Sequence, residues 1–285
     1  MEDLYKETLG LLKLYGIKAN KSLGQNFLIN SNVLETIIKS SNITKDDLVI
    51  EIGPGLGTLT NKLIEISGKV ICIEIDSKMI DILNNRFKDK ENIVIINKDI
   101  LKCDLQQIID ENKENYNKIK VVANLPYYIT TPIIMKLLED KVMVETITIM
   151  VQKEVAERLT AKPGDEKCGG ITFAVNYYSK PETILQVSHE DFYPSPEVDS
   201  SIIKLNILKK PPINVQNEGL LFKIVKIGFN NRRKTLLNNI YNATIVSDKK
   251  KIKEILNDLG IDENRRGETL TLEEYEKLTN YLEKI

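Results

Sequence analysis

Apolar residues gather in seven short runs that more polar stretches separate. Helical spacing of apolar residues falls between the early runs, for example at 78–87 and 132–139. Alternating strand and helix patterns predict a mostly parallel sheet with helices on both faces. The last two runs follow each other without a helix, which predicts an antiparallel edge. The seven runs cover residues 48–52, 70–75, 93–96, 119–123, 145–151, 183–187 and 201–207.

The pattern changes near residue 210. Segment 209–219 contains Pro-Pro and several polar residues, and only helical patterns follow it. We therefore expect two domains: an α/β domain over 1–210 and a small all-helical domain over 211–285. A chain of 285 residues is consistent with one or two domains. The polar, glycine-rich segment 162–170 indicates a loop.

A glycine-rich turn follows the first apolar run. Gly53, Gly55 and Gly57 stand at alternate positions, and glycine permits backbone angles and close approaches that a Cβ forbids. Glu74 ends the second run, 21 positions beyond Gly53, where a carboxylate can accept from ribose hydroxyls. The spacing differs from the Gly-x-Gly-x-x-Gly of dinucleotide sites. By itself the turn is weak evidence for a particular ligand. It is compatible with S-adenosylmethionine, which, unlike a dinucleotide, has no pyrophosphate to bind.

The tetrapeptide Asn124–Tyr127 follows the fourth run. The Asn124 side-chain oxygen and a neighbouring backbone carbonyl can accept hydrogen bonds from an exocyclic amine of a nucleobase. Those bonds aim the lone pair of the nitrogen at an electrophile. Pro126 stiffens the turn, and Tyr127 offers a face on which a base can stack. An ordinary turn is the alternative, because Asn and Pro are common turn formers; the glycine-rich turn upstream favours chemistry.

The charge is unevenly distributed. The net charge of −1 does not by itself indicate a polyanionic partner. Residues 208–285 nevertheless hold 15 basic and 11 acidic side chains, and residues 220–240 hold five basic and no acidic ones. Among them Arg232, Arg233 and Lys234 are consecutive within a helical pattern. Basic stripes are typical of nucleic-acid binding, although a solvated helix face is the alternative.

Several classes of protein are disfavoured. The chain has no apolar run of about 18 residues and no basic-plus-apolar leader, so we expect a cytoplasmic protein without membrane association. Three cysteines at spacings of 31 and 65 form neither a disulfide framework nor a pair of metal ligands. His189 is the single histidine, which argues against a histidine-based triad. We expect no metal site.

Together these motifs resemble the rRNA adenine dimethyltransferase family, and within it the branch that acts on bacterial small-subunit rRNA. Glu197 departs from the pattern, because a basic residue is associated with that position in the family. The segments that carry the resemblance are 21–28, 51–57, 74–76, 98–100, 124–132, 152–159, 192–200 and 232–236.

The resemblance implies a class I S-adenosylmethionine-dependent methyltransferase fold, Rossmann-like, with a small helical C-terminal domain that binds rRNA. It implies transfer of methyl groups to N6 of two adjacent adenosines in the 3′-terminal hairpin of small-subunit (16S) rRNA. The expected cofactor is S-adenosyl-L-methionine. The expected partner is the rRNA of the small ribosomal subunit or its precursor, and we expect a monomer.

The resemblance also implies roles for individual residues. The expected cofactor-binding residues are Gln25, Asn26, Leu28, Gly53, Gly55, Glu74, Asp99 and Asn124. The expected catalytic residues are Asn124, Leu125, Pro126, Tyr127 and Phe192. The expected RNA-binding residues are Lys21, Lys223, Arg232, Arg233 and Lys234. Asp99 could instead be a helix N-cap, Asn26 a turn residue, and the Phe192 segment a rigid edge loop.

Three alternatives remain open. A methyltransferase of the macrolide-resistance type would act on large-subunit rRNA, but 128–132, 192–196 and 232–236 favour the small-subunit branch. A DNA adenine methyltransferase is disfavoured by the short helical domain. A non-catalytic rRNA-binding assembly factor would keep the fold without the chemistry; the intact glycine turn and Asn124–Tyr127 argue against lost chemistry.

Overall fold

The computed structural model describes residues 2–19, 24–162, 164–231 and 233–284. Its contacts divide the chain into two compact units, each described here by itself. The first unit consists of Met1–Ala156 and Pro181–Ile207, and the second of Glu157–Lys180 and Leu208–Ile285. No helix within the described residues is both long and apolar enough to cross a membrane.

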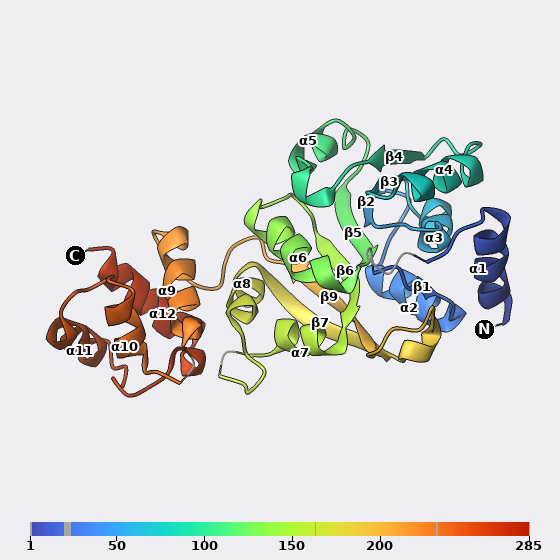
Figure 1. Ribbon diagram of the computed structural model, residues 1–285. Coiled ribbons are helices and arrows are strands. Elements are labelled where there is room, and N and C mark those ends of the chain that lie inside the picture. The colour runs from blue at the N-terminus through green and yellow to red at the C-terminus, as the bar shows by residue number, and fades with distance from the viewer. Residues whose placement is uncertain (1, 20–23, 163, 232, 285) are drawn as a thin grey trace. The chain divides into compact units, whose positions relative to one another are not determined.

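The first unit is built on a seven-stranded sheet in the order β4-β3-β2-β5-β6-β9-β7. Strands β2 to β6 pair in parallel, and β9 pairs antiparallel with β6. The mostly parallel sheet with an antiparallel edge is thus confirmed. Figure 1 shows these strands side by side with helices flanking them. The strands are β2 (Asp47–Ile52), β3 (Lys69–Glu74), β4 (Ile93–Asn97), β5 (Lys118–Asn124), β6 (Thr146–Gln152), β7 (Ser179–Val187) and β9 (Ser200–Ile207).

Helices cover the sheet, and a second, two-stranded sheet lies beside it. Strands β2 and β5 are almost wholly buried, as expected of central parallel strands that helices cover on both faces. Strand β1 (Phe27–Leu28) pairs antiparallel with β8 (Phe192–Tyr193). The helices are α1 (Glu2–Leu14), α2 (Ser31–Ser41), α3 (Thr58–Ile66), α4 (Ser77–Arg86), α5 (Leu105–Asp110) and α6 (Thr130–Glu139), with the short η2 (Ile100–Lys102), η3 (Tyr127–Ile129) and η4 (His189–Asp191). Helix α7 (Lys153–Thr160) begins in the first unit and ends in the second.

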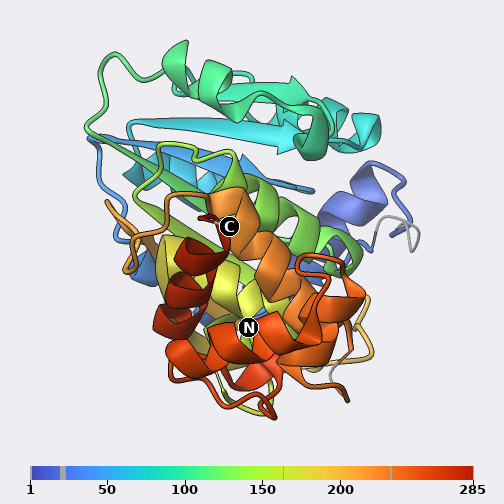
Figure 2. The same ribbon diagram turned by 90° about the vertical axis from the view of Figure 1, so that its left-hand side faces the viewer.

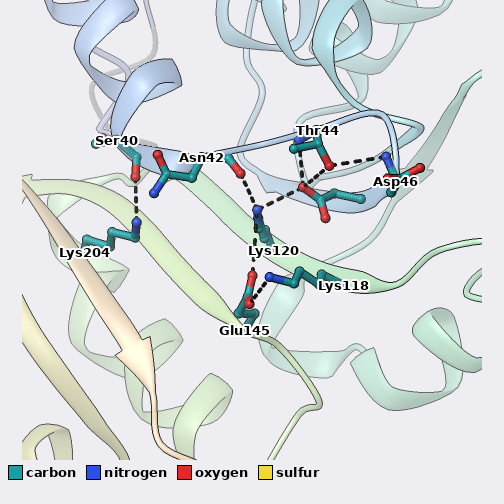
Figure 3. A network of polar contacts seen from close by, with 9 residues as sticks. Ser40, Asn42, Thr44, Asp46, Lys118, Lys120, Glu145 and Lys204 are labelled. Atoms are coloured by element: carbon teal, nitrogen blue, oxygen red, sulfur yellow. Dashed lines mark hydrogen bonds and ion pairs between the residues drawn. The ribbon is translucent and has the colours of Figure 1, made fainter.

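A buried ion pair lies where β2 and β5 begin. Lys120 Nζ is 2.9 Å from Asp47 Oδ2, and the two side chains are 4% and 2% exposed. Lys120 also donates to the carbonyl of Asn42, and Asp47 accepts from the backbone N–H of Thr44 at 2.7 Å. Figure 3 shows that this network ties the segment between α2 and β2 to strand β5. Because parallel strands start at one edge of a sheet, the network stands at the edge opposite their carboxyl ends.

The second unit is helical. Figure 2 shows α9 to α12 gathered into one group. Phe173 and Tyr177 of α8 are buried in the same apolar cluster as Leu221, Ile224 and Tyr275. The elements are α8 (Gly170–Tyr178), α9 (Glu218–Asn230), α10 (Leu236–Asn242), α11 (Lys249–Asp258), η5 (Gly267–Thr269) and α12 (Leu272–Leu282). The contacts thus place 157–180 with the C-terminal helices, whereas the sequence pattern had assigned that segment to domain 1–210.

Candidate active site

The proposed catalytic and cofactor-binding residues come together around one pocket. Every one of them lines it, from Gln25 near the N-terminus to Phe192. Strands β2, β3, β4 and β5 are parallel, so their carboxyl ends meet at one edge of the sheet. In open α/β sheets ligands bind at that edge. Residues that are far apart in the sequence therefore lie around one pocket in the fold, although their individual roles stay predictions.

Glycine is required in the turn after β2 for two separate reasons. Gly53, Gly55 and Gly57 have φ of +68°, +54° and +80°, in the left-handed region that side chains disfavour. A Cβ on Gly57 would also lie 2.7 Å from the Phe87 ring and 2.9 Å from Leu83. Glycine thus lets α3 start close to α4, and it leaves the backbone of the turn accessible from the pocket.

Glu74 is fixed at the end of β3 by backbone donors. Its Oε1 accepts from the N–H groups of Ile75 and Asp76, each at 2.9 Å, and its Oε2 accepts from Gly55 at 3.1 Å. Burial raises the pKa of Glu74, whose residue is 7% exposed. A carboxylate has about four acceptor sites, so the carboxylate is held in place and can still accept from a ligand hydroxyl.

The pocket lining is acidic. Glu51 is 1% exposed and accepts from the Thr60 hydroxyl at 2.6 Å. Burial raises the pKa of Glu51 to about 7. With Glu74 and Asp99, it gives three carboxyl groups against one amine, Lys98, among the described lining residues. A cation in the pocket would favour the ionised form of Glu51, so such a lining suits a positively charged ligand. Glu51 falls in segment 51–57, for which the resemblance implied no role at this residue; a carboxylate among the otherwise apolar residues 48–52 was the available signal.

Asp99 and Asn26 both line the pocket. Each also makes the local hydrogen bond expected of its alternative role, helix N-cap for Asp99 and turn residue for Asn26. Asp99 is the N-cap of η2, with Oδ1 accepting from Leu101 N at 3.0 Å. Asn26 donates to the carbonyl of Gly24 at 3.3 Å, as a turn residue does. Both residues nevertheless belong to the lining. A cap and a ligand contact are compatible, since an Asp side chain has a second oxygen.

The segment Asn124–Tyr127 leaves β5 directly into the pocket. The N–H of Leu125 donates to Met150 of β6 at 3.3 Å, which holds the start of the segment. The carbonyl of Pro126 accepts from Ile129 N at 3.2 Å and from the Thr130 hydroxyl at 3.1 Å. Its end is therefore held by the first turn of the following helices. Asn124, the last residue of β5, lies directly before these two anchors and lines the pocket.

Two aromatic residues of the pocket come from distant segments. The Tyr127 hydroxyl lies 2.7 Å from the Ser200 hydroxyl, and burial raises the pKa of Tyr127. Phe192 is 3% exposed and pairs with Leu28 across the β1–β8 sheet. Asn30 supports that sheet by donating to Asp191 at 2.6 Å. The N-terminal segment that carries Asn26 and Leu28 is thereby joined to the segment that carries Phe192.

The candidate RNA-binding residues that the structure describes, Lys223, Arg233 and Lys234, belong to the helical unit. Lys21 and Arg232 fall outside the described residues. Lys223 is exposed on α9, and Arg233 and Lys234 are exposed in the turn that joins α9 to α10. The expectation of a continuous helix through them is wrong. Helix α9 ends at Asn230, and the Thr235 hydroxyl caps α10 by accepting from Asn238 N at 3.3 Å.

Two solved structures that share this fold are methyltransferases. A dimethyladenosine transferase from Plasmodium falciparum superposes with a TM-score of 0.77 at 29% identity, covering 90% of this chain and 98% of that one. The 23S rRNA methyltransferase ErmE superposes with a TM-score of 0.67 at 23% identity, covering 90% and 100%, and likewise has this fold. The fold and the pocket define a class I S-adenosylmethionine-dependent methyltransferase.

The family follows from sequence comparison. The family model described as ribosomal RNA adenine dimethylase matches residues 16–283. Two proteins named ribosomal RNA small subunit methyltransferase A are similar to this chain over nearly their whole length. The one from Alkaliphilus oremlandii is 47% identical, over 98% of this chain and 97% of that protein; the one from Clostridioides difficile is 45% identical, over 98% and 96%. This chain belongs to the ribosomal RNA adenine dimethylase family.

Proposed function

We propose that this protein transfers methyl groups from S-adenosylmethionine to N6 of two adjacent adenosines in the 3′-terminal hairpin of small-subunit rRNA, which gives N6,N6-dimethyladenosine. The observation that carries the proposal is the position of Asn124–Tyr127 in the same pocket as Glu74. An acceptor pair for an amine and a carboxylate for a ribose thus face one cavity. The target adenine has to leave its surroundings to enter such a pocket.

The pocket residues fit the cofactor. Glu74 would accept from the ribose, Asp99 from the adenine amine, and Asn26 and Leu28 would contact the methionine end. Gln25 lines the same pocket and donates to Asp76 at 2.9 Å. The acidic lining suits the positive sulfonium and ammonium groups. When bound, S-adenosylmethionine supplies an electrophilic methyl group on a sulfur that leaves as a neutral thioether.

The protein contributes alignment and charge stabilisation. In the first transfer Asn124 and the Leu125 carbonyl would accept the two N6 hydrogens, so that the nitrogen lone pair points at the methyl group; in the second transfer one N6 hydrogen remains for these acceptors. The same acceptors stabilise the positive charge that develops on nitrogen. No general base is needed to start, because the proton leaves to water after the transfer. Tyr127 stacks on one face of the adenine and Phe192 walls the other.

Replacement of Glu74 by Ala is expected to weaken S-adenosylmethionine binding by about 1.5–3 kcal/mol, the range for hydrogen bonds to charged groups. Titration calorimetry measures the affinity. Glu65→Ala, which removes an exposed carboxylate from α3, is the matched control. Unchanged affinity in the Glu74 variant would remove this residue from the cofactor site.

Replacement of Arg232, Arg233 and Lys234 by Gln is expected to weaken RNA binding and to flatten its salt dependence. The slope should fall by somewhat less than one unit per lost phosphate contact. Filter binding across a salt series measures this, with Lys88→Gln/Lys90→Gln as the control for exposed lysines in the turn between α4 and β4. Cofactor affinity without RNA should stay unchanged. An unchanged slope would assign these residues to a role other than phosphate binding.

Labelled methyl transfer tests the function as a whole. Unmethylated small-subunit particles, large-subunit particles and duplex DNA are offered as substrates, and the modified base is then mapped. Label on two adjacent adenosines of the small-subunit rRNA is the expected result. Label on large-subunit rRNA would favour the macrolide-resistance type instead, and particle binding without any label would favour a non-catalytic assembly factor.

The proposal extends to partner and location. A single chain carries all the residues that the proposed chemistry uses, so we propose a monomer that acts on a precursor of the small subunit. Bacterial ribosomes assemble in the cytoplasm, which is where such an enzyme would act.

A further inference from the structure

A buried hydroxyl stands beside the proposed stacking residue. Ser200 is the first residue of β9 and is 0% exposed. Its Oγ lies 2.7 Å from the hydroxyl of Tyr127, so one of the two groups donates to the other. The bond spans 73 positions of sequence and joins β9 to the segment that follows β5. The proposed chemistry does not use Ser200, although a serine closes the 192–200 motif.

Ser200 occupies a fixed position. It pairs with Gln152 in the antiparallel ladder between β9 and β6. The carbonyl of the preceding Asp199 accepts from Lys153 N at 2.9 Å, and its carboxylate accepts from His189 N at 3.0 Å. Hydrogen bonds on both sides hold this part of the strand in place. The Ser200 hydroxyl that faces Tyr127 is therefore attached to a fixed backbone.

Tyr127 needs such an anchor at its far end. Its backbone is fixed by the turn at Pro126, but a tyrosine ring still rotates about its two side-chain torsions. A hydrogen bond at the hydroxyl fixes the tip of the ring and hence the direction of its axis. Because the phenolic O–H is conjugated with the ring and prefers to lie in its plane, the bond also favours the ring plane that contains the Ser200 oxygen. The plane in turn sets the orientation of any base that stacks on it, and a small misorientation is costly for in-line transfer.

We propose that Ser200 is a positioning residue: its hydrogen bond to the Tyr127 hydroxyl sets the ring plane on which the target adenine stacks. This inference rests on the proposed function and adds a residue to it. Ser200 does not reach substrate or cofactor in this arrangement. Its effect therefore passes through Tyr127, and it should change turnover while leaving cofactor binding unchanged.

A double-mutant cycle tests the inference. Ser200→Ala and Tyr127→Phe each remove the bond from one side, and Tyr127→Phe retains the ring for stacking. Each variant is expected to lower kcat roughly 5- to 10-fold, the effect of one neutral hydrogen bond. KM for the small-subunit particle and the affinity for S-adenosylmethionine should remain near the parent values. The double variant should be no slower than either single one, because the same bond is lost in all three.

The control is Ser201→Ala, which removes a buried hydroxyl from the next residue, on the opposite face of the strand. Its kcat should equal that of the parent. Multiplicative effects in the double variant, or a Ser200→Ala enzyme with normal kcat, would overturn the inference. If Ser200→Ala does not fold, Tyr127→Phe with unchanged kcat overturns it just as well. A parent protein that transfers no methyl group would overturn the proposed function. An active parent with an unaffected Ser200→Ala variant would overturn only the inference, so the two failures are distinguishable.

Discussion

Asn124→Ala is expected to lower the rate of methyl transfer by about a hundredfold or more, the size of the loss when one group that stabilises a transition state is removed. The carboxamide accepts from the amine whose nitrogen becomes positive during transfer, so its interaction strengthens as the reaction proceeds. An interaction of that kind affects turnover more than binding. Single-turnover assays with unmethylated small-subunit particles measure the rate of transfer itself, and RNA affinity should change little.

Two variants sharpen this test. Asn124→Asp keeps an acceptor but alters its charge, so part of the rate should be retained relative to Asn124→Ala. Asn85→Ala removes an exposed carboxamide from α4 and should leave the rate unchanged. Near-normal turnover in Asn124→Ala would mean that another group aligns the amine.

The sequence predicted those site residues that lie at the ends of strands. Apolar runs that stop at Glu74 and Asn124 are visible in the sequence, and a parallel sheet necessarily brings such ends together. The pairing of Leu28 with Phe192 was not visible, because strands of two residues carry no periodicity. The hydrogen bond between Ser200 and Tyr127 could not be predicted either. It joins residues 73 positions apart, and such a contact depends on the order of the strands in the sheet.

The helical unit shows a similar limit. A break at 209–219 marks where the strand pattern ends, but it does not say which helices share a core. Phe173 and Tyr177 pack with the C-terminal helices because their rings fill a cluster that includes Tyr275, 5.0 Å from Phe173 between ring centroids. Likewise, the sequence pattern predicted a helix through Arg233 and Lys234, but these residues lie in a turn and Thr235 caps the start of a new helix.

Lys120→Met is expected to reduce the free energy of unfolding by about 3–5 kcal/mol, the cost of leaving one partner of a buried ion pair without the other. Asp47 would remain 2% exposed with its countercharge removed. Chemical denaturation followed by circular dichroism measures the change. Because the pair lies at the sheet edge opposite the pocket, the folded variant should bind S-adenosylmethionine with the parent affinity.

Lys118→Met is the matched control, two residues earlier on the same strand. Lys118 also pairs with a carboxylate, 2.6 Å from Glu145, but its side chain is 53% exposed and water screens that pair. Its loss should therefore cost a small fraction of the loss at Lys120. Adding Asp47→Asn to Lys120→Met should restore part of the stability, since it removes the uncompensated charge. Equal destabilisation by the two lysine variants would show that burial contributes nothing to this pair, and that the segment between α2 and β2 is held by its backbone bonds instead.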